Sequence, residues 1–431
     1  MNGEPQPQDP LTGRRVLVAI SGSIAAVKLP LVVSALVQRG CEVRCLLSPS
    51  AERLVSAVAL GSLSRHGCYL ETDQWSHRAP RPLHVELAEW AELILVAPLS
   101  ASSLGRWVHG LGDTLLASVL LAAEVPVVAA AAMNTAMWNS PGVLANWRAL
   151  QNFPGVLPLE PTSGLLACDR RGDGRMAEPV QLLLALESLA LRGRTGDWKG
   201  RRLLVSAGAT REPLDPARCL TNPSTGLMGV MLAQAARLRG ASVQLVHGPL
   251  ALDPSLLEGL EAFPITTAAE LQSCLQQHQS SADAIAMAAA VSDHRRSSPL
   301  AEKRPKSELA AELQQGWEPV PDLLAELVAR RPASQPILGF AAHSGDVLDQ
   351  ARAKFRLKGC DLLFANPIDR PDAGFGTPTN RGWLLGPGQA VQDMPLSSKF
   401  VLAHRLVDAL GALLRRPEAG DAQEAPAAAD P

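Results

Sequence analysis

The chain has 431 residues, 47% of them hydrophobic and 19% charged, with a formal net charge of -2. A chain of this size can bury two cores, and its balanced charge excludes a strongly basic or acidic field that would attract nucleic acid or an anionic membrane. The seven cysteines are scattered, without a CxxC pair or zinc spacing, which is typical of a reducing compartment. We therefore predict a cytoplasmic, two-domain protein that acts on small molecules.

Residues 1–12 are rich in Pro and Gln and predict a disordered arm rather than a signal peptide. The first domain is predicted for residues 13–190. Its opening stretch, residues 14–47, runs from an apolar strand through a Ser-Gly-Ser loop into an amphipathic helix and then a second strand. Strands that alternate with helices imply a parallel sheet with right-handed crossovers.

Further strands of the first domain are expected at residues 93–98 and 125–131. The stretch 115–133 comes nearest to a membrane span, but Glu124 and Pro126 divide it into a helix end and a short strand. We therefore predict that both pieces are interior rather than membrane-spanning.

A polar stretch with glycines at residues 191–200 is the predicted linker, and a second α/β domain is predicted for residues 201–415. This domain repeats the design of the first, with a strand, a long polar loop, a helix at 226–239 and another strand. The last residues, 416–431, lack an apolar period and predict a disordered tail. Additional strands are expected at 284–290, 337–342 and 362–367.

The loop Ser21-Gly22-Ser23 follows the first strand and opens a helix, so its backbone N–H groups and hydroxyls suit a phosphate. It lacks the spaced glycines of GxGxxG, and the second strand ends at Ser48 rather than at an acid that would hold an NAD ribose. A mononucleotide such as FMN therefore fits better than NAD. A plain βα turn without a ligand is the alternative.

A second ligand loop is predicted at residues 206–229, where a long polar segment separates a strand from a helix. Ser224 and Thr225 are placed to cap that helix, and Gly226 and Gly229 allow close approach.

Lysines later in the chain are candidates for binding phosphates. Lys303 and Lys306 lie in the string EKRPK, whereas Lys354 and Lys358 are four residues apart and share a face of a predicted helix. Together they could neutralise a triphosphate. A solvated helix face is the alternative.

Several strings occur in the order and spacing of one known family. They are SGSIAAVK, HVELAEWAELILVAP, AMNTAMW and GLLACDRRGDGRM in the first domain, and SAGATREPLDPARCLTNPSTGLMG, AAAVSDHR, EKRPK, LGFAAHSG and AKFRLKGCDLLFAN in the second. Over about residues 14–414 the chain resembles the bifunctional phosphopantothenoylcysteine decarboxylase/phosphopantothenate-cysteine ligases of coenzyme A biosynthesis. The resemblance implies a flavodoxin-like FMN domain followed by a second, Rossmann-like α/β ligase domain.

The resemblance gives a role to the isolated Cys168. Decarboxylation of an N-acyl cysteine needs an electron sink, which flavin provides by oxidising the thiol to a thioaldehyde. Cys168 would donate a proton when the hydride returns to the enethiol that decarboxylation leaves. His84 would orient or deprotonate the substrate, Asn134 would hold its carboxylate, and Arg175 would grip carboxylate or phosphate.

The segment around Cys168 would act as a flap. Gly164, Gly172 and Gly174 would give it the freedom to close. Three residues depart from the family pattern in this domain, namely Ser102, Ala131 and Asp169. The residues that the resemblance implies for FMN binding are Ser21, Gly22, Ser23, Ser48, Pro98, Ser100, Ser102 and Met137.

The second domain would activate 4'-phosphopantothenate with CTP and Mg2+ as an acyl-cytidylate, which the amine of L-cysteine attacks. Asn222 would hold the acyl-cytidylate, and the Mg2+ ligands are not assigned. Pro305, inside the lysine cluster, and His343, where the family usually has glutamate, depart from the pattern. The residues implied for CTP binding are Ala288, Ala289, Asp293, Lys303, Pro321, Asp322, Leu323, Leu324, Phe340, Lys354 and Lys358.

The product phosphopantothenoylcysteine would be decarboxylated to 4'-phosphopantetheine in the first domain. Members of the family assemble as trimers of flavin domains linked by dimers of ligase domains, so the resemblance implies a homo-oligomer, a dodecamer. An NAD(P)-dependent reductase and a flavin-binding regulatory subunit are the rival functions. The missing ribose acid disfavours the reductase, and Cys168 together with the whole ligase half disfavours the regulatory subunit.

Overall fold

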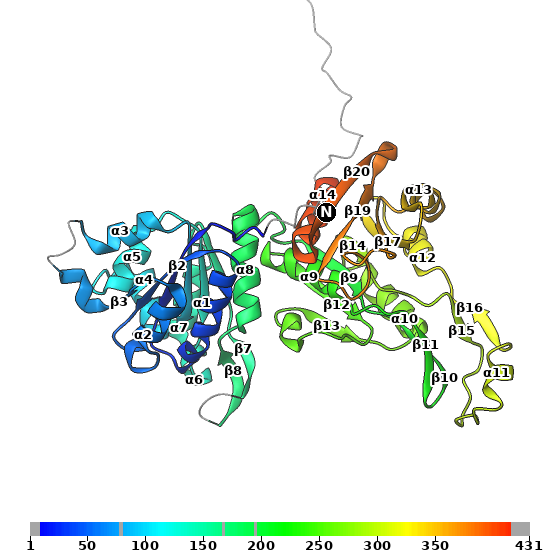
Figure 1. Ribbon diagram of the computed structural model, residues 1–431, viewed down its shortest axis with the longest axis horizontal. Coiled ribbons are helices and arrows are strands. Elements are labelled where there is room, and N and C mark those ends of the chain that lie inside the picture. Colours follow the sequence, from blue (N-terminus) through cyan, green and yellow to red (C-terminus); the bar gives the residue numbers. More distant parts are fainter. Residues whose placement is uncertain (1–8, 77–80, 166–168, 194–195, 415–431) are drawn as a thin grey trace, which may run out of the picture. The chain divides into compact units, whose positions relative to one another are not determined.

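The computed structural model describes residues 9–76, 81–165, 169–193 and 196–414 (Figure 1). The chain divides into two compact units. The first comprises Met1–Gly196 together with Asp253–Gly259, and the second comprises Asp197–Leu252 and Leu260–Pro431. Each unit has its own central β-sheet with helices packed against it, as the alternation of strands and helices predicts.

The sheet of the first unit is entirely parallel, in the order β3-β2-β1-β4-β5-β6. At its centre β1 (Arg15–Ile20) pairs with β4 (Leu93–Leu99), and nearly all of their residues are buried. Continuous apolar strands of this kind are expected where helices cover both faces of a sheet. The remaining strands are β2 (Glu42–Leu47), β3 (Cys68–Tyr69), β5 (Val127–Ala131) and β6 (Val156–Leu159).

Some helices of the first unit start at side chains that accept a hydrogen bond from the first turn, namely α2 (Ala57–Ser64), α4 (Ala101–Val108), α5 (Leu115–Ala122) and α6 (Thr135–Trp138). The Thr114 hydroxyl accepts from Ala117 N at 3.2 Å at the start of α5. Because α5 ends at Ala122 and β5 begins at Val127, the apolar stretch is divided into a helix and a strand as predicted. The other helical segments of this unit are η1 (Ile24–Lys28), α1 (Leu29–Gln38), η2 (Ala51–Arg53), η3 (Glu71–Trp75), α3 (Leu83–Trp90), α7 (Pro141–Leu150), α8 (Pro179–Arg192) and η4 (Pro254–Leu257).

The prediction of a disordered arm through residue 12 is wrong for residues 9–12. Leu11 is fully buried, and Asp9 forms an ion pair with Arg39 at 2.6 Å. One apolar side chain and one ion pair therefore hold this stretch against the sheet, and the Pro and Gln content of its neighbours gave no sign of either. The proposed boundaries of the linker, 191–200, remain a prediction, and α8 extends two residues into it.

The segment predicted to be a flexible flap is in part a β-hairpin. It pairs β7 (Thr162–Leu165) with β8 (Arg171–Arg175) in antiparallel fashion. Because these strands are short, polar and rich in glycine, their sequence carries no alternating apolar pattern. Cys168 lies outside the described residues.

The sheet of the second unit has the order β13-β12-β9-β14-β17-β18-β19-β20. Its first six strands are parallel, whereas β19 (Thr379–Leu385) and β20 (Val391–Ser398) form an antiparallel edge that the sequence did not predict. The predicted strands at 284–290, 337–342 and 362–367 correspond to β14, β17 and β18. The parallel strands are β9 (Arg202–Ala207), β12 (Ser242–His247), β13 (Glu261–Pro264), β14 (Ala284–Met287), β17 (Ile337–His343) and β18 (Leu362–Pro367).

Helices of the second unit include the one predicted at 226–239, which is observed as α9 (Leu227–Leu238). Gly229 of α9 packs so closely on β9 that a Cβ atom there would lie 2.6 Å from the Ala207 Cβ atom, which confirms the predicted close approach. The other helical segments are α10 (Ala268–Gln279), α11 (Leu309–Glu312), α12 (Leu323–Arg330), α13 (Val347–Lys358), η5 (Pro387–Gln389) and α14 (Lys399–Leu414).

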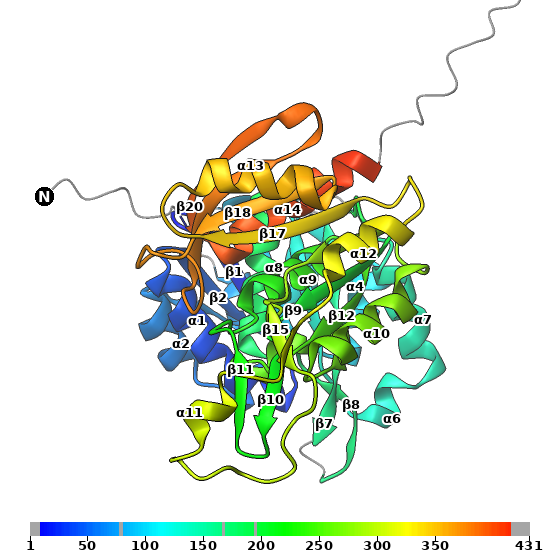
Figure 2. The same ribbon diagram turned by 90° about the vertical axis from the view of Figure 1, so that its right-hand side faces the viewer.

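Two small hairpins extend from the second unit (Figure 2). The predicted polar loop at 206–229 contains the first, formed by β10 (Arg211–Asp215) and β11 (Arg218–Thr221). The second joins β15 (His294–Arg296) to β16 (Trp317–Pro319). Both hairpins are too short and polar to show a strand pattern in the sequence.

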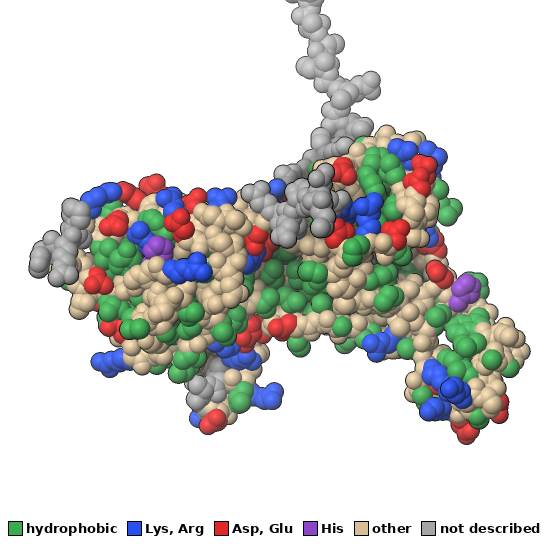
Figure 3. All heavy atoms as spheres, viewed as in Figure 1, with side chains coloured by type: hydrophobic (Ala, Val, Ile, Leu, Met, Phe, Trp, Pro, Cys, Tyr) green, Lys and Arg blue, Asp and Glu red, His purple; other side chains and the backbone are tan. Residues whose placement is uncertain are grey.

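The surface carries both signs of charge on each unit, and basic and acidic side chains are intermingled over the face shown in Figure 3. None of the helices in the described ranges has the length and apolar character needed to cross a membrane.

Candidate active sites

In both units the central strands form a topological switch point, where the helices that follow two neighbouring strands leave in opposite directions. In the first unit the switch lies between β1 and β4, and in the second between β9 and β14. Open α/β sheets bind ligands beyond the carboxyl ends of their strands at such points.

Ser21 connects the two strands at the switch point of the first unit. Its buried hydroxyl donates to Pro98 O at 2.7 Å and accepts from Ser100 N at 2.8 Å. Gly22 follows so tightly that a Cβ atom there would lie 2.4 Å from the Ser50 Cβ atom. Glycine is therefore required at this position, and the loop from Ser21 to Ser23 has a defined shape.

A cavity of about 330 Å³ opens beside this loop. Its lining includes Ser23, Asn134 and Arg175, three residues that the sequence assigned to cofactor or substrate. Two more of its side chains, Ile24 and Leu165, are apolar and 55% and 61% exposed. Exposed apolar side chains around a cavity mark a place where a flat apolar ligand can be covered, so the residues present fit a flavin ring.

The Glu178 carboxylate organises the charged side of this cavity. It accepts from Lys28 Nζ at 2.7 Å and also pairs with the Arg175 guanidinium. Gly164 gives the guanidinium its room, because a Cβ atom there would lie 2.5 Å from Arg175 Nη1. Gly172 packs on α6 in the same way, 2.6 Å from Thr135 Oγ1. Gly164 and Gly172 were predicted to let the flap close, and the structure instead explains them by close packing.

Other residues predicted for this site do not line the cavity. Ser48 N donates to Ile20 O at 3.0 Å at the end of β2, and Ser102 is exposed on α4. Met137 is 49% exposed on α6, and His84 lies half-buried in the first turn of α3. The assignments of these residues remain predictions.

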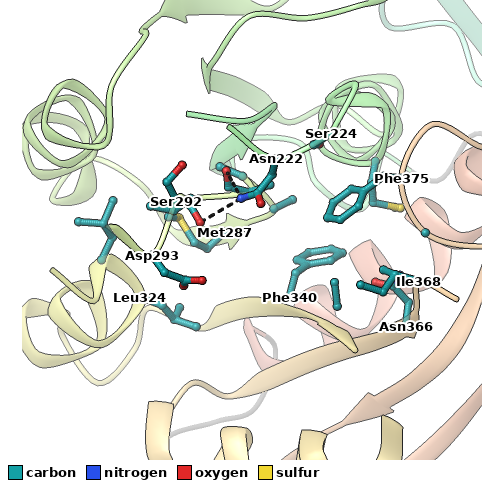
Figure 4. Close-up of a pocket in the computed structure, with 18 of the residues that line it drawn as sticks. Asn222, Ser224, Met287, Ser292, Asp293, Leu324, Phe340, Asn366, Ile368 and Phe375 are labelled. Atoms are coloured by element: carbon teal, nitrogen blue, oxygen red, sulfur yellow. Dashed lines mark hydrogen bonds between the residues drawn. The ribbon is translucent and has the colours of Figure 1, made fainter. Parts of the chain in front are cut away.

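The second unit contains a larger cavity, of about 460 Å³. Asn222 lies at its centre, where Nδ2 donates to Ala290 O at 3.4 Å and to Val291 O at 3.2 Å (Figure 4). The Ser206 hydroxyl positions the same segment by accepting from Ala289 N at 3.1 Å. The asparagine is therefore fixed against the chain that follows β14.

The structure brings most of the predicted nucleotide residues together in this cavity. Asp293 and Leu324 lie on one side of the pocket, with Phe340 between them and the opposite side (Figure 4). Lys303 is exposed in the segment before α11 and does not line the cavity. The predicted residues that do line it are Asn222, Ala288, Ala289, Asp293, Pro321, Asp322, Leu323, Leu324, Phe340, Lys354 and Lys358.

The lysines of α13 face acidic side chains of this cavity. Lys358 Nζ pairs with Asp322, and this hydrogen bond lowers the pKa of Asp322 even though burial alone would raise it. Burial, followed by the charge of Lys358, lowers the pKa of Lys354. Burial and the charge of Lys354 also lower the pKa of His343. A bound phosphate would relieve the repulsion between the two lysines.

Sequence reasoning missed the opposite side of this cavity. Asn366 lies near the end of β18 and Ile368 follows that strand. Phe375 lies in the connection to β19, Asn380 lies in β19, and Lys399 begins α14. The position of Asn366 at the end of an apolar run was a usable signal. The other four come from a region in which no strand or ligand motif was predicted. Within the described ranges, no three His, Cys, Asp or Glu side chains converge as a metal site.

Comparison with known proteins first defines the class of each unit. Residues 5–190 match the family model described as Flavoprotein. Residues 198–413 match the model described as DNA/pantothenate metabolism flavoprotein C-terminal domain. The chain is thus a flavoprotein domain followed by this C-terminal domain, in agreement with the predicted fold class.

Full-length relatives then identify the family. The coenzyme A biosynthesis bifunctional protein CoaBC of Bacillus subtilis (strain 168) is 35% identical over 408 residues, covering 94% of this chain and 98% of the relative. That of Mycobacterium tuberculosis (strain ATCC 25618 / H37Rv) is 37% identical over 418 residues, covering 92% and 96%. The chain belongs to this family of bifunctional coenzyme A biosynthesis enzymes, which confirms the resemblance.

A solved structure of the C-terminal domain of a coenzyme A biosynthesis bifunctional protein CoaBC is 28% identical to the chain, with a TM-score of 0.43. The match covers 51% of this chain and 98% of that structure.

Proposed function

We propose that the second unit joins 4'-phosphopantothenate to L-cysteine at the expense of CTP, and that the first unit decarboxylates the resulting phosphopantothenoylcysteine to 4'-phosphopantetheine with bound FMN. The observation that carries this proposal is the presence of two separate cavities, each at the switch point of its own sheet and each lined by residues of the family motifs. Family membership supports the same two activities.

In the first unit the loop Ser21–Ser23 would hold the FMN phosphate, and the apolar side chains of the cavity would cover the ring. FMN, when bound, supplies the electron sink that lets carbon dioxide leave an N-acyl cysteine. Asn134 and Arg175 would bind the anionic groups of the substrate, and Glu178 would keep the guanidinium in place. Cys168 would deliver the proton that completes the product.

In the second unit the carboxylate of 4'-phosphopantothenate would attack the α-phosphorus of CTP and release pyrophosphate. The cysteine amine would then attack the acyl carbon, forming the amide and releasing CMP. Asn222 would hold the acyl-cytidylate between these steps, and Lys354 and Lys358 would neutralise phosphate charge. Asp293 is exposed and Asp322 is paired, so Mg2+ would arrive bound mainly to the triphosphate.

The protein is further proposed to act in the cytoplasm as a homo-oligomer, a dodecamer by analogy with its family, without a nucleic-acid or membrane partner. The end of β2 supports FMN over a dinucleotide, because Ser48 follows it and no acid stands there to hold a second ribose.

The deciding experiment is incubation of the purified protein with 4'-phosphopantothenate, L-cysteine, Mg2+ and either CTP or ATP, with products identified by mass spectrometry. We expect phosphopantothenoylcysteine to form with CTP, and 4'-phosphopantetheine to appear only when FMN is retained. A reaction without cysteine is the control. Failure to form the acylated cysteine with CTP would contradict the ligase assignment.

A further inference from the structure

The second cavity contains a buried cation for which the described part of the chain provides no counter-ion. The side chain of Lys399, the first residue of α14, is 4% exposed and lines the cavity. Its ammonium group donates to Gly374 O at 2.9 Å, and no described carboxylate pairs with it. Burial lowers the pKa of Lys399 to about 8. A buried charge without a counter-ion costs free energy, so it indicates an anionic ligand that is not part of the chain.

A second polar group converges on the same place. Asn380 is 3% exposed and lines the cavity. Its Oδ1 atom accepts from Gly374 N at 3.3 Å and from Arg381 N at 3.0 Å, which assigns Nδ2 as the group left to donate. Nδ2 has no acceptor among the described residues. Lys399 binds the carbonyl oxygen of Gly374 and Asn380 binds the N–H of the same residue. The two side chains therefore form a compact pair of donors.

The position of this pair relative to the other lysines suggests its ligand. Lys358 pairs with Asp322, which is two residues before Leu324 in the chain. Leu324 and Asp293 lie on one side of the cavity (Figure 4). Lys399 binds the residue before Phe375, which lies on the opposite side, beyond Phe340 (Figure 4). The cavity therefore has two cationic ends with Asn222 between them.

The substrates of the proposed ligation carry anionic groups that fit the two cationic ends of the cavity. The carboxylate of 4'-phosphopantothenate must meet the α-phosphate of the nucleotide, and its own phosphate is at the other end of the molecule. With the nucleotide at the Lys354 and Lys358 end, the phosphate of the acyl substrate falls at the far end. We propose that Lys399 and Asn380 form the subsite for this phosphate monoester and so make the ligase select the phosphorylated acid. This inference rests on the ligase function proposed above.

The test separates the charge of Lys399 from its bond to Gly374. Lys399→Gln keeps a donor for Gly374 O but removes the charge, whereas Lys399→Arg keeps both. We expect Lys399→Gln to lower kcat/KM for 4'-phosphopantothenate about 10- to 100-fold, the range for loss of a charge-assisted hydrogen bond. Activity with pantothenate, which lacks the phosphate, should change little, and the KM for CTP should stay within about twofold. Lys399→Arg should retain most of the selectivity.

A second variant keeps the test independent of how Lys399→Gln folds. Asn380→Asp preserves the oxygen that accepts from Gly374 N but turns a carboxylate toward the proposed phosphate, so selectivity for the phosphorylated acid should fall at least as far. Lys358→Met is the matched control and should raise the KM for CTP instead.

Three results would overturn the proposal. An equal loss with pantothenate and 4'-phosphopantothenate would show that Lys399 only fastens the loop at Gly374. A selective rise in the KM for CTP would assign the subsite to the nucleotide. No ligation by the wild-type enzyme with any nucleotide would remove the proposed function itself, and the subsite with it, whereas the first two results leave that function intact.

Discussion

Individual lysines in the second cavity differ in how their charge is compensated. Lys358 has the carboxylate of Asp322, and Lys354 lies near Asp322 and Asp293. Among the residues that the structure describes, Lys399 has only the backbone carbonyl of Gly374 as a partner. Charges held in a cavity without compensation destabilise the free enzyme and are compensated when an anionic ligand binds. The buried charge therefore lowers the stability of the free protein and raises its affinity for an anionic ligand.

The free energy of unfolding of the protein without ligands should depend on pH because of the buried charge of Lys399. Its pKa of about 8 is below the value of 10.5 in an unfolded chain, so between these pH values the unfolded state binds more protons. The free energy of unfolding of wild type should therefore rise relative to Lys399→Met from pH 8 to 10, by about 1 to 3 kcal/mol. Denaturant unfolding of both proteins without substrates measures this difference. A difference that is constant with pH would contradict the depressed pKa.

Cys168 is the residue on which completion of the decarboxylase reaction is predicted to depend. Cys168→Ser replaces an acid of pKa near 8.5 with a hydroxyl that does not donate its proton at neutral pH. We expect carbon dioxide release to continue while the enethiol form accumulates in place of 4'-phosphopantetheine. Mass spectrometry of the products resolves the two compounds. Normal yield of 4'-phosphopantetheine in this variant would exclude the proposed role.

At the scale of elements, short polar hairpins shape both cavities although they contribute little to either core. The hairpin β7–β8 brings Arg175 to the first cavity, and β11 leads into the segment that carries Asn222. The hairpins hold these side chains by close packing against neighbouring side chains and through backbone hydrogen bonds. Small changes of volume in such elements should therefore alter binding more than stability.

Gly164→Ala tests this expectation for β7. The new methyl group would meet the Arg175 side chain at 2.5 to 2.6 Å and displace its guanidinium from Glu178. We expect the KM for phosphopantothenoylcysteine to rise about 10-fold, as for loss of one charge-assisted hydrogen bond, with FMN content unchanged. Gly142→Ala on α7, where a Cβ atom meets no atom within 4 Å, is the matched control. An unaltered KM in Gly164→Ala would show that Arg175 does not bind substrate.

The strands show which elements the sequence reveals. β4, β14, β17 and β18 are mostly apolar runs, and all four were predicted within a few residues. The edge strand β20 is half-exposed and was not predicted. Burial on both faces produces an unbroken apolar run, whereas an edge strand or a two-stranded hairpin needs none.

At the scale of the whole molecule, the chain consists of two units that each contain a complete sheet and a cavity. A change in one cavity should therefore leave the chemistry of the other intact, because sites that share no residues contribute additively. The two activities can be assayed separately by supplying phosphopantothenoylcysteine directly.

Lys358→Met provides the test of this independence. The variant removes a cation from the end of the second cavity where the nucleotide is proposed to bind, so the KM for CTP should rise about 10-fold or more. Decarboxylation of added phosphopantothenoylcysteine and the flavin absorbance should match wild type. A parallel loss of both activities would show that the two sites are coupled.

The sequence by itself determined the class of fold, the order of the two units and most residues that line one end of the second cavity, because apolar strands and motif strings are contiguous along the chain. Only the tertiary structure decided how Glu178 orients Arg175, and which residues complete the far end of the second cavity. Lys399, Asn380 and Phe375 meet there only after β19, β20 and α14 have packed, since their distance along the chain leaves no local pattern. A site assembled from elements that are far apart in the sequence depends on how those elements pack, and no single segment of the sequence shows that packing.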